Sequence, residues 1–337
     1  MGAGELIYYT DDRPGIRRQR RGRGFSYVAP DGTTIARGTE RARLEALAVP
    51  PAYEDVWMCP VANGHLQATG RDARQRKQYR YHEAWSAAQA ETKFAGLAEF
   101  GHLLPRLRRR VARDLKGEAG ERDFALASAV ALIDRTSIRV GNPDYTRENG
   151  SYGALTLRRH HVKLEGDRIR LRYKGEGGKL VRRQMNDRTL SRILGKIGDL
   201  PGREILTWVD ADGEAQRLGS SALNRYISEA AGGAEVTAKT FRTWAGTRAA
   251  FEVAEAGGAS IKAMADAAAE ELANTPTVAR NSYIHPVIID VLSRKEGWGE
   301  FCERLVLPRA TKYLTRYERG LIAMLRQSPQ AQELLAA

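Results

Sequence analysis

The sequence predicts an α+β fold. A small β-rich N-terminal domain is expected over residues 1–88, and a larger, mainly α-helical domain with a small antiparallel sheet over residues 89–337. Three observations predict it. Residues before about 88 form short β-prone stretches separated by turns. Near residue 84 the composition changes to Ala-rich segments with helical spacing. The length of 337 residues suggests one large domain or two ordinary ones.

The N-terminal region is expected to consist mostly of strands and turns. Phe25–Val28 is followed by Pro30-Asp-Gly-Thr, a turn signature between β-prone stretches. Further strands are expected at Val56–Pro60 and His65–Gly70, and one helix at Thr39–Leu47. The dense arginine cluster Arg17–Arg23 is flanked by glycine and is interpreted as a solvated turn.

The next region is expected to be helical. Apolar residues recur with helical spacing over Glu83–Phe100, Leu104–Leu115 and Asp123–Arg139. Arginines crowd the second of these segments between Arg106 and Arg113. They fit either a phosphate-facing stripe or a solvated face.

A small sheet is expected to interrupt the helices. Val162–Leu164 and Arg168–Tyr173 alternate as strands do, and Gly175–Gly178 is a turn signal. Helices are expected to return from Asp187 onward.

One later helix has clear start and stop signals. Ser260 is a good N-cap, and the helix is expected to end near Ala273, where Asn274-Thr-Pro stops it. The pair Gly257-Gly258 marks a break before it.

The charge balance favours a polyanionic partner. Lys and Arg number 54 against 41 for Asp and Glu, which gives a formal net charge of +13. Such a balance favours nucleic acid through attraction and counterion release. The segment Arg71–His82 interleaves cations with aromatic and amide side chains, which suits contacts to phosphates and base edges together.

The cysteines and the N-terminal sequence narrow the class of protein. Cys59 and Cys302 are far apart and have no CxxC partner, so neither a disulfide framework nor a cysteine zinc site is expected. Both are interpreted as reduced packing residues. No signal peptide and no bilayer-spanning apolar run is seen, so a cytoplasmic protein without a membrane partner is expected.

One tyrosine and the polar residues around it carry the candidate chemistry. Tyr283 follows Asn274 in one segment, Lys239-Thr-Phe-Arg242 lies upstream, and Asp134-Arg-Thr-Ser-Ile-Arg139 lies further upstream. Tyrosine is a poor nucleophile at its ordinary pKa of about 10. Cations fixed at a phosphate stabilise both the phenolate and the transition state. Arginine binds two phosphate oxygens at once, and lysine can protonate the leaving oxygen.

This set predicts an enzyme that breaks and rejoins DNA through a phosphotyrosine, without a metal. Each residue alone also fits a structural role. Asn274 could cap its helix, Arg139 could be an ion-pair partner, and Arg242 could stack near Trp244. Their joint arrangement favours the catalytic interpretation.

The ordered motifs closely resemble those of the bacterial, poxvirus-like type IB DNA topoisomerases, and the resemblance runs over nearly the whole chain. The matching segments are Gly24-Phe-Ser-Tyr-Val-Ala-Pro-Asp-Gly, Asn63-Gly-His-Leu-Gln-Ala-Thr-Gly-Arg-Asp-Ala-Arg, Lys77-Gln-Tyr-Arg-Tyr-His, Asp134-Arg-Thr-Ser-Ile-Arg-Val-Gly-Asn, Tyr145-Thr-Arg-Glu-Asn-Gly-Ser-Tyr-Gly, Lys239-Thr-Phe-Arg-Thr-Trp, Asn274-Thr-Pro and Tyr283.

The resemblance implies a C-shaped clamp on duplex DNA that works as a monomer in the bacterial nucleoid, with no ATP, metal or other cofactor. It implies that Tyr283 forms a 3′-phosphotyrosyl bond and that Arg139 and Arg242 stabilise the transition state. Asn274 occupies the position where the family has His or Asn, and Lys239 matches an auxiliary lysine. The implied DNA contacts are Gln67, Arg71, Arg74, Lys77, Tyr79, Arg80 and Tyr145.

One position departs from the family pattern. The family's general-acid lysine lies in the turn of the small sheet, and counting from Arg139 that position here is Glu176. A carboxylate repels phosphate, and an ionised Glu has no proton to donate. Either Lys174 takes the role, or Lys179 reaches back across the turn, or the enzyme is slow or inactive. Lys174 is the preferred substitute, as a residue two positions away on the same strand face.

Two alternative functions follow from these observations. A tyrosine recombinase shares the chemistry of two arginines and a tyrosine. A catalytically weakened DNA-binding clamp is the other alternative, because Glu176 replaces the usual lysine.

Overall fold

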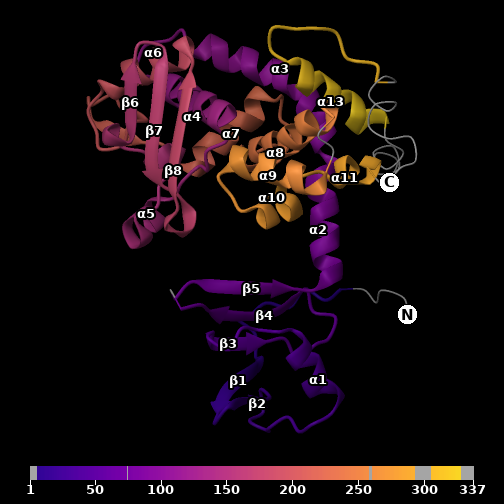
Figure 1. Cartoon of the computed structure of the whole chain (residues 1–337). Coiled ribbons are helices and arrows are strands. Elements are labelled where there is room, and N and C mark those ends of the chain that lie inside the picture. Colours follow the sequence, from indigo (N-terminus) through magenta and orange to yellow (C-terminus); the bar gives the residue numbers. More distant parts are fainter. Residues whose placement is uncertain (1–5, 74, 258–259, 293–304, 328–337) are drawn as a thin grey trace. The chain divides into compact units, whose positions relative to one another are not determined.

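The computed structural model describes residues 6–73, 75–257, 260–292 and 305–327. The chain divides into two compact units, residues 1–93 and 94–337, and the division falls within helix α2 (Glu83–Ala95). Figure 1 shows a β-rich N-terminal unit and a larger, mainly helical unit. The predicted α+β class is confirmed, whereas the C-shaped clamp stays a prediction.

The N-terminal unit is an antiparallel sheet of five strands in the order β2-β1-β3-β4-β5. Its small core includes Ile16, Leu44 and Met58, so the sheet and helix α1 share one apolar interior. The elements are β1 (Ile16–Arg21), β2 (Gly24–Val28), α1 (Thr39–Ala46), β3 (Glu54–Met58), β4 (Leu66–Arg71) and β5 (Lys77–Tyr81).

The arginine cluster of this unit lies on a strand, which corrects the prediction of a turn. Residues Ile16–Arg21 form β1 and pair with β2 across a turn in which Gly22 has a φ of 54°. Arg18 lies over the Phe25 ring at 4.2 Å and donates hydrogen bonds to carbonyls of the segment 49–53. Cation–aromatic packing therefore makes an arginine-rich sequence compatible with a strand.

The C-terminal unit is built around helix α4 (Arg122–Thr136), which is buried along most of its length. Such a helix is apolar on nearly all sides because other elements cover it all round. Its helices are α3 (Leu97–Asp114), α5 (Pro143–Asn149), α6 (Arg188–Gly198), α7 (Ser220–Ala230), α8 (Ala238–Glu255), α9 (Ile261–Leu272), α10 (Pro276–Tyr283), α11 (Pro286–Leu292) and α13 (Arg316–Gln327), with short 3-10 turns at Ala154–Thr156, Arg159–His161 and Glu176–Gly178.

A three-stranded antiparallel sheet lies in the same unit, in the order β6-β7-β8 (Figure 1). Its strands are β6 (Val162–Glu165), β7 (Arg168–Lys174) and β8 (Leu180–Asn186). Along β7 every second side chain is buried, and Tyr173 is on the buried face while Lys174 is on the exposed face. The β7–β8 hairpin therefore presents its turn, residues 175–179, at the end where Lys174 pairs with Leu180.

Two element boundaries differ from the prediction, and one small sheet was not predicted. The first helical break lies at Gly96 rather than after Phe100, and α3 continues through Pro105. Helix α4 ends at Thr136, because Ser137 adopts a left-handed φ of 53°, so Arg139 lies beyond the helix. A two-stranded sheet, β9 (Thr207–Val209) with β10 (Ala215–Arg217), lies where only helices were expected.

Cys59 is buried and is not in a disulfide, and burial raises the pKa of its thiol. Cys302, Arg74 and Gly258 lie outside the described residues. Within the described part of the chain, no helix combines the length and apolarity needed to cross a bilayer.

Candidate active site

Arg139 lies in the segment that follows helix α4. The carbonyls of Arg139 and Val140 accept hydrogen bonds from the N–H groups of Ala154 and Leu155, each at 2.8 Å. Gly153 is required for this approach, since a Cβ there would lie 2.4 Å from the Arg139 oxygen. The segment that carries Arg139 is therefore fixed by main-chain contacts.

Arg242 comes from helix α8 and is almost fully buried, at 5% exposure. It donates to the main-chain carbonyls of Ser137 and Leu272 and has no ion-pair partner among the described residues. Burial lowers the pKa of Arg242, and the neighbouring charge of Arg139 lowers it further. Its Nε is buried without an acceptor in the described part of the chain. A buried cation with spare donors is suited to an anion.

Asn274 lies beside Arg139 because helix α9 stops just before it. Ala273 takes a left-handed φ of 53°, and Asn274 follows with 9% exposure. Its Oδ1 accepts from Arg139 Nη2 at 2.8 Å. Its Nδ2 is buried without an acceptor among the described residues, which leaves a second donor for a ligand oxygen.

Tyr283 ends helix α10 and meets Arg242. The Arg242 Cζ lies 5.3 Å from the Tyr283 ring centroid, and the two side chains hydrogen-bond. Thr247 Oγ1 donates to the Tyr283 carbonyl at 2.9 Å. A Cβ at Gly246 would lie 2.9 Å from the Tyr283 Cβ, so α8 and the tyrosine approach closely only because residue 246 is glycine.

A pocket in the C-terminal unit is lined by both arginines and by the β7–β8 turn. Its lining includes Arg139, Arg242, Tyr173, Glu176 and Lys179. Tyr173 was not singled out by sequence reasoning, although the alternation of β7 places it on the inner face. The chemistry that the pocket offers is anion binding by guanidinium groups next to a phenol.

Glu176 and Lys179 both turn toward this pocket. Glu176 Oε2 lies 2.8 Å from Arg139 Nη2, and Lys179 Nζ donates to the main-chain oxygen of Asn274 at 3.2 Å. Between them, Gly177 and Gly178 have φ of 71° and 78°, which favours glycine. The turn thus places one carboxylate and one ammonium group next to Arg139 and Asn274.

Two predicted catalytic lysines do not lie at the pocket. Lys174 is exposed on the face of β7 opposite Tyr173, and β7 ends there, so it shares no strand face with Glu176. Lys239 is exposed near the start of α8, one turn before Arg242. Neither lines the pocket. Asn274 and Tyr283 do not line it either, but each contacts one of its arginines.

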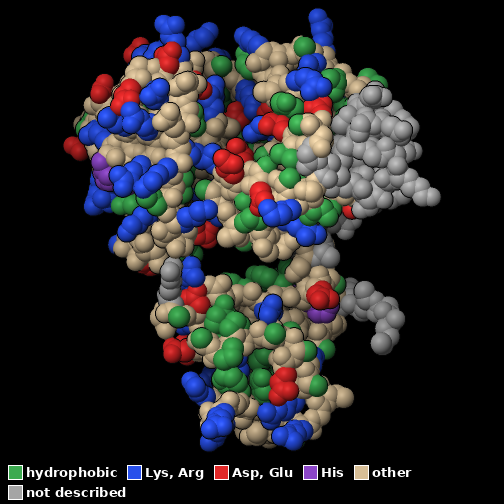
Figure 2. Space-filling model, viewed as in Figure 1, with side chains coloured by type: hydrophobic (Ala, Val, Ile, Leu, Met, Phe, Trp, Pro, Cys, Tyr) green, Lys and Arg blue, Asp and Glu red, His purple; other side chains and the backbone are tan. Residues whose placement is uncertain are grey.

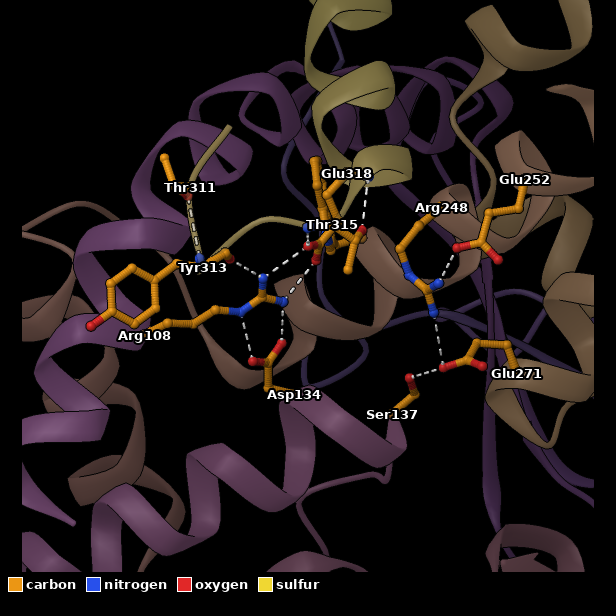
Figure 3. Close-up of polar contacts among 11 residues, drawn as sticks. Arg108, Asp134, Ser137, Arg248, Glu252, Glu271, Thr311, Tyr313, Thr315 and Glu318 are labelled. Atoms are coloured by element: carbon orange, nitrogen blue, oxygen red, sulfur yellow. Dashed lines mark hydrogen bonds and ion pairs between the residues drawn. The ribbon is translucent and has the colours of Figure 1, made fainter. Parts of the chain in front are cut away.

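Two ionic networks surround the end of α4 (Figure 3). In one, Ser137 Oγ donates to Glu271 at 2.6 Å, and Glu271 lies 3.6 Å from Arg248. In the other, Arg108 donates to Asp134 and to Glu318, at 2.7 to 2.9 Å. The two carboxylates raise the pKa of Arg108 despite its burial. These contacts join α3, α4, α8, α9 and α13 around the segment that carries Arg139.

These networks also account for the arginines of α3. Arg108 is enclosed by two carboxylates, and Arg110 and Arg113 both pair with Asp114. The side chains of Arg108 and Arg110 are therefore engaged within the unit and form no free stripe, whereas the Arg113 side chain is 67% exposed and lies in solvent.

The candidate DNA contacts of the N-terminal unit differ in exposure. Gln67 is 4% exposed, donates to the carbonyls of Ala62 and Gly64, and accepts from Arg43. Its amide is therefore occupied inside the unit, which does not favour the predicted DNA contact. Arg71, Lys77, Tyr79 and Arg80 are exposed, and Arg74 lies outside the described residues.

Aromatic rings are also exposed in the N-terminal unit. Tyr79 is stacked on Tyr81, with ring centroids 6.2 Å apart, and Tyr8 is stacked on His65. Tyr8 and Tyr81 are 65% and 44% exposed. Tyr81 lies in the predicted segment Arg71–His82 without being among the implied contacts, and sequence reasoning missed Tyr8. In the C-terminal unit Tyr145 is 57% exposed on α5. Figure 2 shows Lys and Arg side chains over the visible face of both units.

Comparisons with known proteins agree with this geometry. Residues 24–72 match the model of the bacterial DNA topoisomerase IB N-terminal domain, and residues 79–280 match that of the eukaryotic DNA topoisomerase I catalytic core. Tyr283 lies just beyond the second match. The DNA topoisomerase 1B of Acanthamoeba polyphaga mimivirus is 31% identical over 234 residues, which are 68% of this chain and 69% of that protein.

Solved structures are more distant. The XerH site-specific recombinase bound to its difH substrate, in a pre-cleavage complex, is 16% identical with a TM-score of 0.37, over 55% of this chain and 49% of that chain. The post-cleavage complex on palindromic difH gives 14% and 0.36, over 54% and 47%. TM-scores at this level carry no argument about function.

The two family models and the viral relative show that this chain belongs to the type IB DNA topoisomerases, which are isomerases of DNA.

Proposed function

We propose that this chain relaxes supercoiled duplex DNA by cutting and resealing one strand, with Tyr283 as the nucleophile. The observation that carries the proposal is the convergence of Arg139, Arg242 and Asn274 with Tyr283, from four separate segments of the C-terminal unit. Family membership supports DNA as the substrate.

In this proposal the scissile phosphate binds at the two guanidinium groups. Arg242 is buried without a counter-ion among the described residues, so a phosphate supplies the missing charge. The Asn274 Nδ2 and Arg242 Nε groups lack acceptors within the described part of the chain, and phosphate oxygens are suitable acceptors. Charge that develops on those oxygens in the transition state is stabilised where the arginines are already fixed.

The reaction is a pair of transesterifications. The Tyr283 oxygen attacks phosphorus, a 3′-phosphotyrosyl bond forms, and the bond to the 5′ oxygen breaks. After strand rotation, the 5′ hydroxyl attacks the phosphotyrosine and the tyrosine leaves. One ester is exchanged for another in each step, so the proposal requires neither ATP nor a metal ion.

The N-terminal unit contributes duplex binding in this proposal. Its exposed Arg71, Lys77, Tyr79 and Arg80 offer cations and aromatic faces, as Tyr145 does in the C-terminal unit. We propose Lys239 as an auxiliary cation one helical turn before Arg242. The protein acts as a monomer in this scheme.

The test is relaxation of supercoiled plasmid in EDTA without ATP. The unmodified chain should relax the plasmid and leave a covalent protein–DNA adduct after denaturation with detergent. Tyr283→Phe should do neither, while Tyr317→Phe, at a tyrosine 37% exposed in the same unit, should behave as the unmodified chain. Relaxation by Tyr283→Phe would refute the mechanism.

A DNA clamp without catalysis is the second candidate, because Glu176 is paired with Arg139 at 2.8 Å. It predicts salt-sensitive duplex binding. Adduct formation at Tyr283 would exclude it.

A further inference from the structure

We infer that Lys179 is the proton donor to the leaving 5′ oxygen, an inference that rests on the proposed cleavage by Tyr283. Strand cleavage expels an alkoxide, which is a poor leaving group unless a positioned acid protonates it. The acid must lie at the pocket that holds the phosphate. The structure narrows the choice of residue.

Lys179 is the sole lysine among the described residues that line the pocket. Its Nζ donates to the main-chain oxygen of Asn274, whose side chain accepts from Arg139. The ammonium group therefore lies next to the groups that are to bind the phosphate. An ammonium proton held there is within reach of an oxygen leaving phosphorus once the bond to the Asn274 carbonyl is exchanged.

Glu176, Tyr173 and the arginines of the pocket are less suited. Glu176 forms an ion pair with Arg139 at 2.8 Å, and a carboxylate in an ion pair accepts hydrogen bonds rather than donating a proton. Tyr173 is 6% exposed, and burial raises the pKa of its phenol, so it keeps its proton. Arginine keeps its proton throughout the accessible pH range.

The lysines outside the pocket are not placed to act as the proton donor. Lys174 alternates with buried Tyr173 and so points to the opposite face of β7. Lys239 is exposed and, among the described residues, forms no hydrogen bond with Asn274, whereas Lys179 does. The turn glycines explain how Lys179 reaches the site, because Gly177 and Gly178 in left-handed conformations fold the chain back before residue 179.

The proton that Lys179 gives up in cleavage returns to it in resealing. On cleavage the Lys179 ammonium gives one proton to the 5′ oxygen and becomes an amine. On resealing the amine takes the proton back from the 5′ hydroxyl as that oxygen attacks phosphorus. No outside acid or base is consumed.

The experiment measures single-turnover cleavage of two matched duplexes, one with the natural 5′ oxygen at the scissile phosphate and one with sulfur in its place. Sulfur leaves without a proton, because thiols are far stronger acids than alcohols. Lys179→Ala should cut the oxygen substrate about 10²-fold more slowly or worse. It should cut the sulfur substrate within a few-fold of the unmodified chain.

Three further variants separate proton transfer from other roles. Lys179→Arg keeps the charge but holds its proton, so it should stay slow on oxygen and fast on sulfur. Lys174→Ala, the matched control five residues earlier, should cut both substrates at the unmodified rate. Tyr283→Phe should cut neither.

Equal slowing of Lys179→Ala on both substrates would show a structural role and overturn the inference. The inference would also fail if Lys174→Ala cut the oxygen substrate slowly and the sulfur substrate at the unmodified rate. Full activity of Lys179→Ala on oxygen would also overturn it. Cleavage by Tyr283→Phe would instead refute the proposed function, so the two failures are distinguishable.

Discussion

Arg139 Nη2 donates a hydrogen bond to Asn274 Oδ1 at 2.8 Å, although the two residues are 135 positions apart in the chain. Each follows a helix that ends in a left-handed residue, Ser137 after α4 and Ala273 after α9. The ends of two helices thus bring together a guanidinium and an amide. The same Arg139 nitrogen also contacts Glu176 at 2.8 Å, so Glu176 competes with any phosphate for this group.

Glu176→Gln is expected to lower the DNA concentration that gives half-maximal cleavage. Glu176 is 67% exposed in its side chain and Arg139 34%, so the ion pair contributes little. Exposed pairs contribute about 0–1 kcal/mol, which corresponds to a shift of up to about fivefold. Single-turnover cleavage across a DNA titration measures it.

The control for that prediction is Glu165→Gln, which removes an exposed carboxylate from β6 that pairs with Lys163 and Arg170. It should leave the half-maximal concentration unchanged. A higher half-maximal DNA concentration for Glu176→Gln would show that the carboxylate assists the reaction rather than competing with phosphate.

Gly246→Ala should slow cleavage while duplex binding persists. The added methyl group would lie 2.9 Å from both the Tyr283 Cβ and Leu272 Cδ1, so the tyrosine must shift. Overpacking of this kind costs about 1–3 kcal/mol, and misplacement of the nucleophile lowers the cleavage rate by about 10-fold or more. The matched control is Gly219→Ala, since nothing lies within 4 Å of a Cβ there. Unchanged cleavage by Gly246→Ala would mean that the position of Tyr283 in this structure is not the reactive one.

Asp134→Asn should destabilise the C-terminal unit. Arg108, Asp134 and Glu318 have side chains 21%, 10% and 4% exposed, so the network is poorly hydrated (Figure 3). Removing one carboxylate charge leaves Arg108 with Glu318 alone, at a cost of about 2–3 kcal/mol. Urea denaturation measures the loss. Asp266→Asn, at an exposed i,i+4 pair with Lys262, should change stability by no more than about 0.5 kcal/mol. Equal effects of the two substitutions would contradict the network's role.

Substitutions in the N-terminal unit should separate DNA affinity from stability. Arg80→Ala should weaken duplex binding and reduce the slope of log affinity against log salt by about 1. Gln67→Ala should lower stability instead, because its buried amide is bonded to Arg43 and to the carbonyls of the loop before β4. Binding isotherms at several salt concentrations and thermal denaturation measure the two effects. A salt slope that Gln67→Ala lowers and Arg80→Ala leaves unchanged would reverse the assignment.

Much of the fold could be predicted from local patterns. The alternation along β7 and the caps at Ser260 and Ala273 are properties of neighbouring residues, and the structure has them where the sequence indicates. The β9–β10 hairpin was missed because its turn depends on Asp210, whose side chain accepts from the N–H groups of Asp212 and Glu214. That signal competes with the helical pattern on both sides.

The candidate site was predictable as a set of residues but not as a geometry. Arg139 was expected on a helix, yet a single left-handed residue, Ser137, ends α4 before it. Lys174 was preferred over Lys179 by extending strand alternation into a turn, where alternation no longer holds. Gln67 lies in a motif that suggested DNA contact, but its burial depends on carbonyls from the preceding loop.

Acid should weaken the C-terminal unit through His285. This residue is 6% exposed, packs its ring 5.1 Å from that of Phe94, and accepts from the Val287 N–H through Nδ1. Burial lowers the pKa of His285 from 6.5 to about 4. The unfolded chain therefore binds a proton between these values that the folded chain does not. The stabilisation is fully present above pH 6.5 and is lost as pH falls toward 4, by up to about 3 kcal/mol.

The comparison is with His285→Asn, which keeps an acceptor for the Val287 N–H but does not titrate. Urea denaturation at pH 8, 7, 6 and 5 should show a stability gap between the two chains that narrows as pH falls. A gap that stays constant with pH would mean that His285 titrates alike in the folded and unfolded chains.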